Sequence, residues 1–320
     1  MAKPLALRID RVHELLDEGL HSHGFRVEVD LYSTAFELGI RYPETRCLIV
    51  RSRIPVDAIL MQSMPQLECI VRVGSGTEGI DLEAARQNGI AVYNTPEGNR
   101  NAVGEHALGL LLNLMRKVCT ANNQIRQGVW NRHENTGVEL EGKTVGIIGY
   151  GNTGRSFARK LAGFDVEVLA YDIVPGVGDK YARQVEMDEI FQKADVVSLH
   201  VPLTPLTRGL VNSGWIGRFG KAFWLINTSR GEVVDTAHLL QALEQGRLHG
   251  AALDVVEYEQ KAFGNETSLN RWPEVFHRLA ARPDVIITPH IAGLTRESYR
   301  KLARTALEKI LRHFGLEENK

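Results

Sequence analysis

Arginine, carboxylate and histidine side chains follow three short apolar segments in the second half of the chain. Arg230 comes shortly after Phe223–Ile226, Asp254 directly after Gly250–Leu253, and His290 shortly after Val285–Ile287. A planar guanidinium pairs with a carboxylate in two places, and a histidine exchanges protons near neutral pH. Residues of these types can together hold a small organic acid and move a proton to or from its oxygen.

Spacing alone leaves two alternatives open at this set of residues. A second histidine, His200, follows the apolar segment Val196–Leu199, so either histidine could be the proton donor. Glu257 and Glu259 both lie just beyond Asp254, and either carboxylate could sit beside the histidine and favour its charged form.

A glycine-rich turn is predicted between a strand and a helix. The strand Thr144–Ile148 is followed by Gly149–Gly154, which reads G-x-G-x-x-G, and then by the helical segment Arg155–Ala162. The glycines let backbone N–H groups approach a pyrophosphate at the positive end of the helix. Asp172 follows the next strand, where a carboxylate binds the adenosine ribose and repels a 2′-phosphate. The order of these parts predicts NAD as the cofactor.

The phosphate-loop pattern of NTPases overlaps the start of this region. Gly137–Thr144 reads G-x-x-x-x-G-K-T, which would make Lys143 a phosphate ligand in an ATPase or kinase. That motif requires a strand before it and a helix after it. Residues 131–136 are polar and Val145–Ile148 is strand-like, so we interpret the match as a coincidence.

Short apolar runs alternate with helix-length segments throughout the chain, which predicts an α/β fold with parallel sheets covered on both faces. The remaining expected strands are Leu5–Ile9, Arg26–Val29, Cys47–Val50, Cys69–Val73, Ile90–Val92 and Val166–Tyr171. Ligands of such sheets bind at the carboxyl ends of the strands, where the residues above should meet. The apolar segment from Asn101 to about Arg126 predicts one long buried helix, and Arg296–Phe314 predicts a closing helix.

Length and composition narrow the class of protein. The 320 residues suggest two domains, and a net charge of −1 gives no reason to expect nucleic acid or a membrane as partner. The 3 cysteines fit neither a metal site nor a disulfide framework and are expected to be reduced thiols. The N-terminal residues lack the apolar stretch of a signal peptide, which predicts a cytoplasmic protein.

The chain resembles the D-isomer-specific 2-hydroxyacid dehydrogenases over nearly its whole length. The matching segments are Gly149–Gly154, His200–Arg208, Ile226–Gly231, Ala252–Glu259 and Thr288–Gly293. The resemblance implies hydride transfer between NAD and a small 2-hydroxy or 2-keto acid. It also implies two doubly wound parallel-sheet domains, with an NAD-binding Rossmann domain (102–290) inserted into a flavodoxin-like substrate domain (1–101 and 291–320). Such proteins are homodimers joined through a long helix like Asn101–Arg126.

The resemblance also implies roles for single residues. Arg230 would bind substrate, His290 would be the acid/base, and Glu259 would orient and charge that histidine. Cofactor-binding residues would be Gly149, Gly151, Asn152, Thr153, Gly154, Asp172, His200, Pro202, Thr228, Ser229, Asp254, Ile291, Ala292 and Gly293. The backbone N–H groups of a first-domain loop, Gly74, Ser75 and Gly76, would take the substrate carboxylate. The family commonly has Pro where this chain has Gln260, so the following loop is expected to take its own course.

The segment Val50–Arg53 resembles the part of phosphoglycerate dehydrogenases that approaches the substrate phosphate. Arg51 and Arg53 alternate along a chain expected to be extended, so both would point to one face and clamp a phosphate. This predicts 3-phosphoglycerate as the substrate, with glyoxylate or hydroxypyruvate reduction as the alternative. Some relatives are NAD-sensing binding proteins instead, but the presence of Arg230, Glu259 and His290 favours an enzyme.

Overall fold

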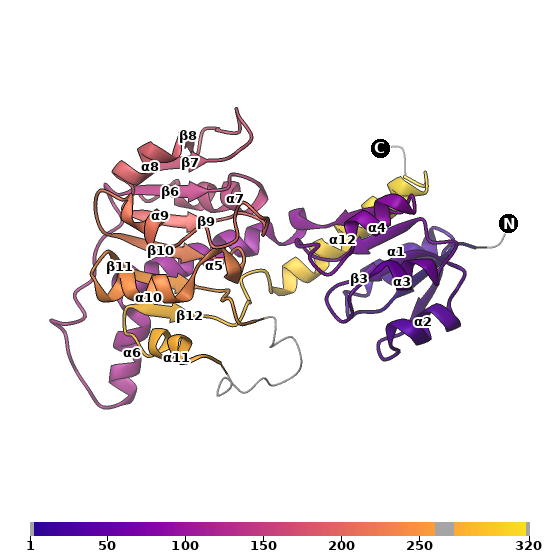
Figure 1. Ribbon diagram of the computed structural model, residues 1–320, viewed down its shortest axis with the longest axis horizontal. Coiled ribbons are helices and arrows are strands. Elements are labelled where there is room, and N and C mark those ends of the chain that lie inside the picture. Colours follow the sequence, from indigo (N-terminus) through magenta and orange to yellow (C-terminus); the bar gives the residue numbers. More distant parts are fainter. Residues whose placement is uncertain (1–2, 260–271, 318–320) are drawn as a thin grey trace. The chain divides into compact units, whose positions relative to one another are not determined.

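The computed structural model describes residues 3–259 and 272–317, and it separates into two α/β units (Figure 1). The first unit comprises Met1–Arg100 and Leu294–Lys320, and the second comprises Asn101–Gly293. The second unit is therefore inserted into the chain of the first. The segment after Gln260, for which a course of its own was predicted, lies outside the described residues.

The sheet of the first unit has the strand order β2-β1-β3-β4-β5, with all neighbours parallel. This is the flavodoxin-like order predicted for the substrate domain. The strands are β1 Leu5–Arg8, β2 Arg26–Val29, β3 Thr45–Val50, β4 Cys69–Arg72 and β5 Ala91–Asn94. The helices are α1 Leu15–Ser22, α2 Ala35–Arg41, α3 Ala58–Gln62, α4 Leu82–Gln87 and the closing helix α12 Arg296–His313.

Both faces of this sheet are buried, because successive side chains of a strand point to opposite faces. On β3, Cys47 and Ile49 pack into one apolar cluster with residues of α1 and α12. Leu48 and Val50 face the other way, into a cluster that includes residues of α2, α3 and α4. The closing helix thus completes the core of the first unit.

The sheet of the second unit has the strand order β12-β11-β10-β9-β6-β7-β8, again with all neighbours parallel (Figure 1). The strands are β6 Thr144–Ile148, β7 Glu167–Tyr171, β8 Arg183–Gln184, β9 Val196–Leu199, β10 Phe223–Asn227, β11 Leu248–Leu253 and β12 Val285–Ile287. The order reverses between β6 and β9, which is the switch point where dinucleotides bind in such sheets. The two-residue strand β8 is too short to leave a pattern in the sequence.

The second unit also contains helices that precede, connect or follow these strands. They are α5 Pro96–Arg116, which begins in the first unit, α6 Val118–Arg126, α7 Asn152–Leu161, α8 Met187–Lys193, α9 Ser213–Gly217, the short η1 Gly231–Val233, α10 Thr236–Glu244 and α11 Glu274–Ala280. Among the described residues, no helix is long and apolar enough to cross a membrane.

The prediction of one continuous buried helix over 101–126 is wrong. Lys117 has a left-handed backbone (φ 55°), which ends α5 and starts α6 in a new direction. Leu111 and Met115 of α5 are buried in the core, whereas α6 has no buried residue. The prediction was drawn from the apolar residues of α5 and was wrongly extended over the more polar residues of α6.

The phosphate-loop pattern at Gly137–Thr144 does not have the structure that the motif requires. Gly142 turns with φ 69°, and the chain then enters strand β6 instead of a helix. The residues needed to cradle a phosphate at a helix N-terminus therefore lie at Gly149–Gly154 and not at Lys143.

Candidate active site

The glycine turn connects β6 to α7 and has a separate structural reason for each glycine. Gly149 has φ 91°, and a Cβ there would lie 2.6 Å from the His200 carbonyl oxygen. A Cβ on Gly154 would lie 2.1 Å from the Gly149 carbonyl oxygen, so the turn and the helix pack without space for one. A Cβ on Gly151 would have no atom within 4 Å. Gly151 therefore borders open space at the N-terminus of α7.

Asp172 lies directly against this turn. Its Oδ2 accepts a hydrogen bond from the backbone N–H of Tyr150 at 2.7 Å, and its Oδ1 accepts one from Val174 at 2.9 Å. A carboxylate oxygen can accept more than one hydrogen bond. The carboxylate is thus fixed next to the glycine turn with capacity for ribose hydroxyls.

His200 is a buried residue and is excluded as the proton donor. Its ring lies 2.9 Å from the Ser198 hydroxyl through Nε2 and 3.2 Å from the Thr153 hydroxyl through Nδ1. Burial lowers the pKa of His200 to about 3, so the ring is neutral at working pH. Its carbonyl group abuts Gly149, and Pro202 follows two residues later on the exposed surface. This geometry supports the prediction that His200 serves the cofactor edge through its backbone.

The loop after β10 is held by the buried side chain of Asn227. Its Oδ1 accepts hydrogen bonds from the N–H and hydroxyl of Ser229, at 3.0 and 2.7 Å, and its Nδ2 donates to the Arg230 carbonyl at 2.9 Å. The Arg230 Nη1 donates to the Ser229 carbonyl at 2.7 Å. The buried hydroxyl of Thr228 has no hydrogen-bond partner among the described residues. A buried polar atom of this kind calls for a partner from a ligand or water.

Asp254, at the end of β11, organises the turn that carries His290. Its carboxylate accepts hydrogen bonds from the Thr288 hydroxyl at 2.6 Å and from the N–H groups of Ile291 and Ala292 at 2.9 and 2.8 Å. Burial alone would raise the pKa of Asp254, but hydrogen bonds from His106, Thr288 and the two amides hold it below its ordinary value. Asp254 is therefore a buried anion whose Oδ2, facing Ala292, retains accepting capacity.

His290 and Glu259 form the predicted pair. The Nδ1 of His290 lies 2.9 Å from Oε2 of Glu259, and the Glu259 side chain is only 14% exposed. Glu257, the alternative left open by spacing, instead accepts a hydrogen bond from the Thr236 N–H at 2.7 Å, at the start of α10. His290 has a left-handed backbone, with φ 53°. Such strain in a non-glycine residue is typical of functional sites.

These loops meet at one edge of the sheet, because the parallel register continues beyond the strands. The Asp254 N–H donates to the Asn227 carbonyl at 2.9 Å, and the His290 N–H donates to the Asp254 carbonyl at 2.8 Å. A Cβ on Gly231 would lie 2.1 Å from the Val256 backbone. The loop bearing Arg230 therefore lies against the loop that leads to Glu259.

The predicted carboxylate loop of the first unit follows β4. The Ser75 hydroxyl donates to Oδ1 of Asn99 at 2.9 Å, and the Asn94 amide donates to the Ser75 carbonyl at 2.6 Å. A Cβ on Gly74 would overlap the Arg72 guanidinium, so this arginine lies across the loop. The role of Gly74, Ser75 and Gly76 stays a prediction. Arg72 was not singled out in the sequence, because it ends an ordinary-looking strand.

Arg51 and Arg53 lie on a bend after β3 and not on the expected extended chain. The bend forms because Oδ2 of Asp10 accepts the Arg51 N–H at 2.6 Å. The Arg51 guanidinium lies 5.0 Å from the Tyr299 ring centroid. The Arg53 side chain donates to the carbonyls of Ile9, Ser33 and Asp30, at 2.6, 2.7 and 3.2 Å. Arg53 thus ties three backbone segments of the first unit together.

Comparison with known proteins identifies the class that this fold and site define. Residues 108–292 match the model of the D-isomer specific 2-hydroxyacid dehydrogenase NAD binding domain. The chain is 34% identical to the hydroxypyruvate reductase of Thermotoga maritima over 86% of each sequence. It is 35% identical to the D-3-phosphoglycerate dehydrogenase of Archaeoglobus fulgidus over 91% of this chain, and it spans about half (54%) of that relative's length.

A solved structure agrees with this comparison. The D-lactate dehydrogenase of Aquifex aeolicus, determined with NAD and lactic acid, superposes with a TM-score of 0.81 at 27% identity, covering 98% of this chain and 96% of the other. The chain belongs to the D-isomer-specific 2-hydroxyacid dehydrogenases, a family of NAD-dependent oxidoreductases. The predicted fold class, family and cofactor are confirmed.

The residues of the second unit fit NAD. Gly151 leaves open the space where phosphates approach a helix N-terminus, and Asp172 lies beside it. The unpartnered Thr228 hydroxyl lies on the same sheet edge. We expect Gly149–Gly154 to hold the diphosphate and Asp172 to hold the ribose.

Proposed function

We propose that this chain transfers a hydride between NAD and a small 2-hydroxy or 2-keto acid. The observation that carries the proposal is the 2.9 Å pair between His290 and Glu259 at the edge that also bears the glycine turn. The loop of Arg230 lies against the same region, through Gly231. These groups supply an acid, its carboxylate partner and a cation, as reduction of a keto acid requires.

The roles follow from the chemistry of each side chain. Arg230 would hold the substrate carboxylate and polarise the carbonyl, because a guanidinium pairs with carboxylates in two places. Bound NADH supplies the hydride. The Glu259 carboxylate accepts a hydrogen bond from Nδ1 of His290. The proton for the new alkoxide would therefore come from Nε2, on the other side of the ring. We further propose that the first unit binds substrate through Gly74–Gly76.

The substrate that the geometry favours is unphosphorylated, such as glyoxylate or hydroxypyruvate. A two-arginine phosphate clamp needs both guanidinium groups on one face, whereas Arg53 donates to three backbone carbonyls. A phosphorylated substrate is the second candidate. It is supported by the similarity to a D-3-phosphoglycerate dehydrogenase, and Arg51 would be the cation that contacts the phosphate.

A substrate panel tests both proposals. NADH oxidation would be followed with glyoxylate, hydroxypyruvate, pyruvate and 3-phosphohydroxypyruvate. We expect the highest kcat/KM with glyoxylate or hydroxypyruvate. A higher value with 3-phosphohydroxypyruvate would overturn the unphosphorylated assignment. Tight NADH binding without turnover on any of these would contradict the enzyme and indicate an NAD sensor.

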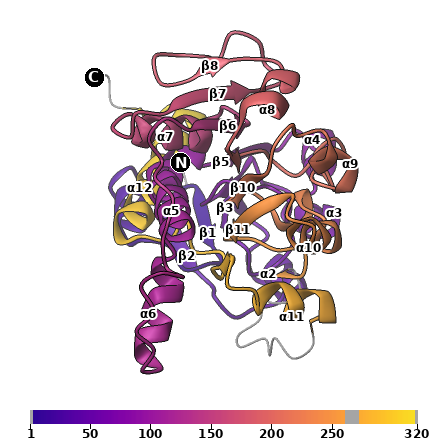
Figure 2. The same ribbon diagram turned by 90° about the vertical axis from the view of Figure 1, so that its left-hand side faces the viewer.

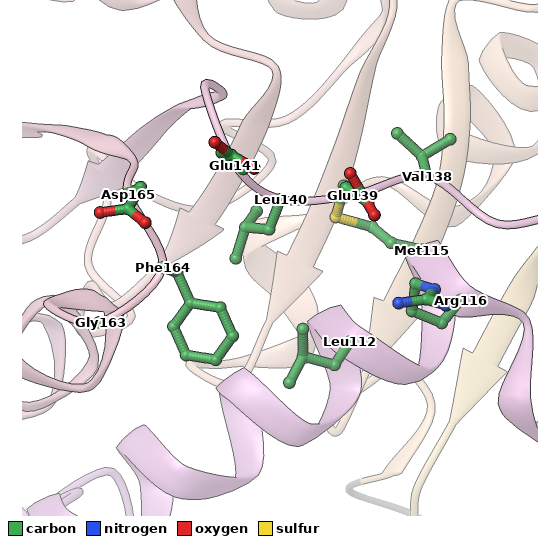
Figure 3. Close-up of a pocket in the computed structure, with 10 residues that line it drawn as sticks. All are labelled: Leu112, Met115, Arg116, Val138, Glu139, Leu140, Glu141, Gly163, Phe164 and Asp165. Atoms are coloured by element: carbon green, nitrogen blue, oxygen red, sulfur yellow. The ribbon is translucent and has the colours of Figure 1, made fainter.

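We also propose that the protein is a homodimer joined through the region around α6. Figures 1 and 2 show α6 extending away from the sheet of the second unit, and Ile125 and Trp130 are 51% and 80% exposed. Beside the end of α5 lies a pocket of about 250 Å³ (Figure 3), and none of the glycine-turn residues lines it. It is lined by Leu112, Met115, Arg116, Val138, Glu139, Leu140, Glu141, Gly163, Phe164 and Asp165. The proposal is supported by the exposed apolar side chains of Ile125 and Trp130, which a partner subunit would cover.

A cytoplasmic location remains part of the proposal. Cys47, Cys69 and Cys119 are all free thiols. Free thiols are typical of proteins in reducing compartments.

A further inference from the structure

His106 reaches the site from outside the loops that form it. It lies on α5, and its Nε2 is 3.1 Å from the Thr288 hydroxyl oxygen and 3.4 Å from Oδ1 of Asp254. The Thr288 hydroxyl donates to the same Asp254 oxygen at 2.6 Å. A chain of hydrogen bonds therefore runs from the His106 N–H through Thr288 to Asp254. His106 was not among the site residues predicted from the sequence.

Asp254 needs these donors because it is 1% exposed. A buried carboxylate is tolerated only when hydrogen bonds or charges compensate the loss of water. Among the described residues, the Asp254 carboxylate is contacted by the side chains of Thr288 and His106 and by the backbone N–H groups of Ile291 and Ala292. His106 is the one ionisable side chain in that set. Removing it would leave the same carboxylate with fewer donors.

The turn that these bonds secure is the one that carries His290. The backbone N–H groups directly after His290 donate to Asp254, and His290 itself has the strained φ of 53°. A strained residue persists only where its surroundings fix it. Loosening the Asp254 carboxylate would therefore let the His290 backbone relax and move its ring away from Glu259.

We propose that His106 is a positioning residue for the hydride-transfer reaction, which acts through Thr288 and Asp254 to hold the His290 turn. The inference rests on the proposed function of His290. It gives α5 a role in the chemistry although no residue of α5 was predicted to touch a ligand. Because His106 acts on the turn that carries His290, its loss should lower kcat, and it should also raise the KM for NADH because Asp254, Ile291 and Ala292 are expected to bind the cofactor.

The test compares two substitutions of His106. Gln places its Nε2 amide close to the position of the histidine Nε2, so His106→Gln can keep the donor to Thr288, whereas His106→Leu removes it. The matched control is His249→Leu, an exposed histidine at the other end of β11. Steady-state kinetics would be combined with hydrogen exchange of the 288–292 amides in the protein without cofactor.

For His106→Leu we expect kcat to fall about 10- to 100-fold, as for other residues that orient a site through a partner. The amides of Ile291 and Ala292 should exchange faster in this variant. His106→Gln and His249→Leu should stay within about threefold of wild type in both measurements. Equal loss in the Gln and Leu variants, or wild-type values in the Leu variant, would overturn the proposal.

Two further outcomes are distinguishable. If His106→Leu does not fold, Thr288→Val breaks the same chain of hydrogen bonds and must give faster exchange at Ile291 and Ala292. If the wild-type protein turns over none of the keto acids, the proposed function fails. The exchange measurement still decides in that case whether His106 holds the turn.

Discussion

Glu259 and His290 share a short hydrogen bond, and the charge of Glu259 can be tested apart from its shape. Glu259→Gln keeps an acceptor oxygen but removes the negative charge that stabilises an imidazolium. We expect kcat for keto-acid reduction to fall at least about tenfold. Steady-state kinetics at saturating NADH would measure this.

Glu257→Gln provides the matched control. Glu257 lies two residues away and accepts from the start of α10, so the same substitution there should leave kcat near wild type. If the Glu257 variant lost as much activity as the Glu259 variant, the pairing of Glu259 with His290 would not explain the effect.

Asp30 gives a prediction about pH and stability in the first unit. Burial alone would raise its pKa, but hydrogen bonds from Ser33 and Tyr32 and the charge of Arg41 outweigh this and lower the pKa from 3.8 to about 2. The ionised Asp30 carboxylate therefore contributes its full stabilisation of the folded state above the unfolded pKa near 3.8. This stabilisation is lost as the pH falls through 2.

Asp30→Asn should accordingly lower the free energy of unfolding by about 1–2 kcal/mol at pH 7. The difference from wild type should shrink as the pH falls from 4 towards 2. Urea denaturation at a series of pH values would measure it. A difference that stays constant down to pH 2.5 would contradict the assigned role of the carboxylate.

At the scale of single residues, spacing predicted which candidate side chains lie at one sheet edge but left their pairings open. The order of strands and polar residues placed Arg230, Asp254 and His290 at one edge, because parallel strands end together. It could not separate His200 from His290, since burial decides between them and burial depends on packing across strands. His106 was missed as a functional candidate because its partner lies 148 positions away, at Asp254 (254 − 106 = 148).

At the scale of elements, two substitutions in the glycine turn distinguish effects on NADH binding from effects on the stability of the fold. Gly151→Ala would place its Cβ in open space without a clash, although alanine adopts the backbone conformation there (φ −84°, ψ −145°) less readily than glycine. It should weaken NADH binding about tenfold or more by occupying the space for phosphates, while the melting temperature falls less than in Gly154→Ala. Gly154→Ala should lower both, because its Cβ would lie 2.1 Å from the Gly149 carbonyl oxygen.

Fluorescence titration with NADH and thermal unfolding of both variants would test this contrast. Wild-type affinity for NADH in Gly151→Ala would show that the diphosphate does not lie over Gly151. An unchanged melting temperature in Gly154→Ala would contradict the close packing of the turn against α7.

Strands were easier to predict than helices for a physical reason. Thr144–Ile148, Val196–Leu199 and Val285–Ile287 have the predicted bounds, because short apolar runs between polar segments have few other structures available. The long helix over 101–126 was wrong because its end is set by one left-handed residue, Lys117, that composition does not reveal.

At the scale of the whole molecule, the proposed homodimer gives a direct prediction. The chain should sediment near twice its mass of 35.7 kDa, and Trp130→Asp should shift it towards 35.7 kDa. Trp130 is 80% exposed, and burying an aspartate at an interface is unfavourable. Tyr32→Asp, at an 87% exposed aromatic residue of the first unit, is the control and should remain dimeric. A wild-type monomer would contradict the proposal.

Domain architecture was accessible from the sequence because each half carries its own alternation of strands and helices. The substrate could not be predicted from the sequence, because it depends on whether the guanidinium N–H groups of Arg51 and Arg53 are available to a ligand. Arg53 donates to backbone carbonyls contributed by Ile9, Asp30 and Ser33. Contacts of that kind arise from loops distant in sequence, and no local pattern encodes them.

The most direct test of the central claim is a crystal structure of the protein with NADH and oxamate, an unreactive analogue of a 2-keto acid. We predict that the Arg230 guanidinium contacts the oxamate carboxylate and that Nε2 of His290 lies about 2.6–3.2 Å from the keto-equivalent oxygen. Oxamate bound away from Arg230, or a His290 ring directed away from the ligand with Glu259 elsewhere, would contradict the account.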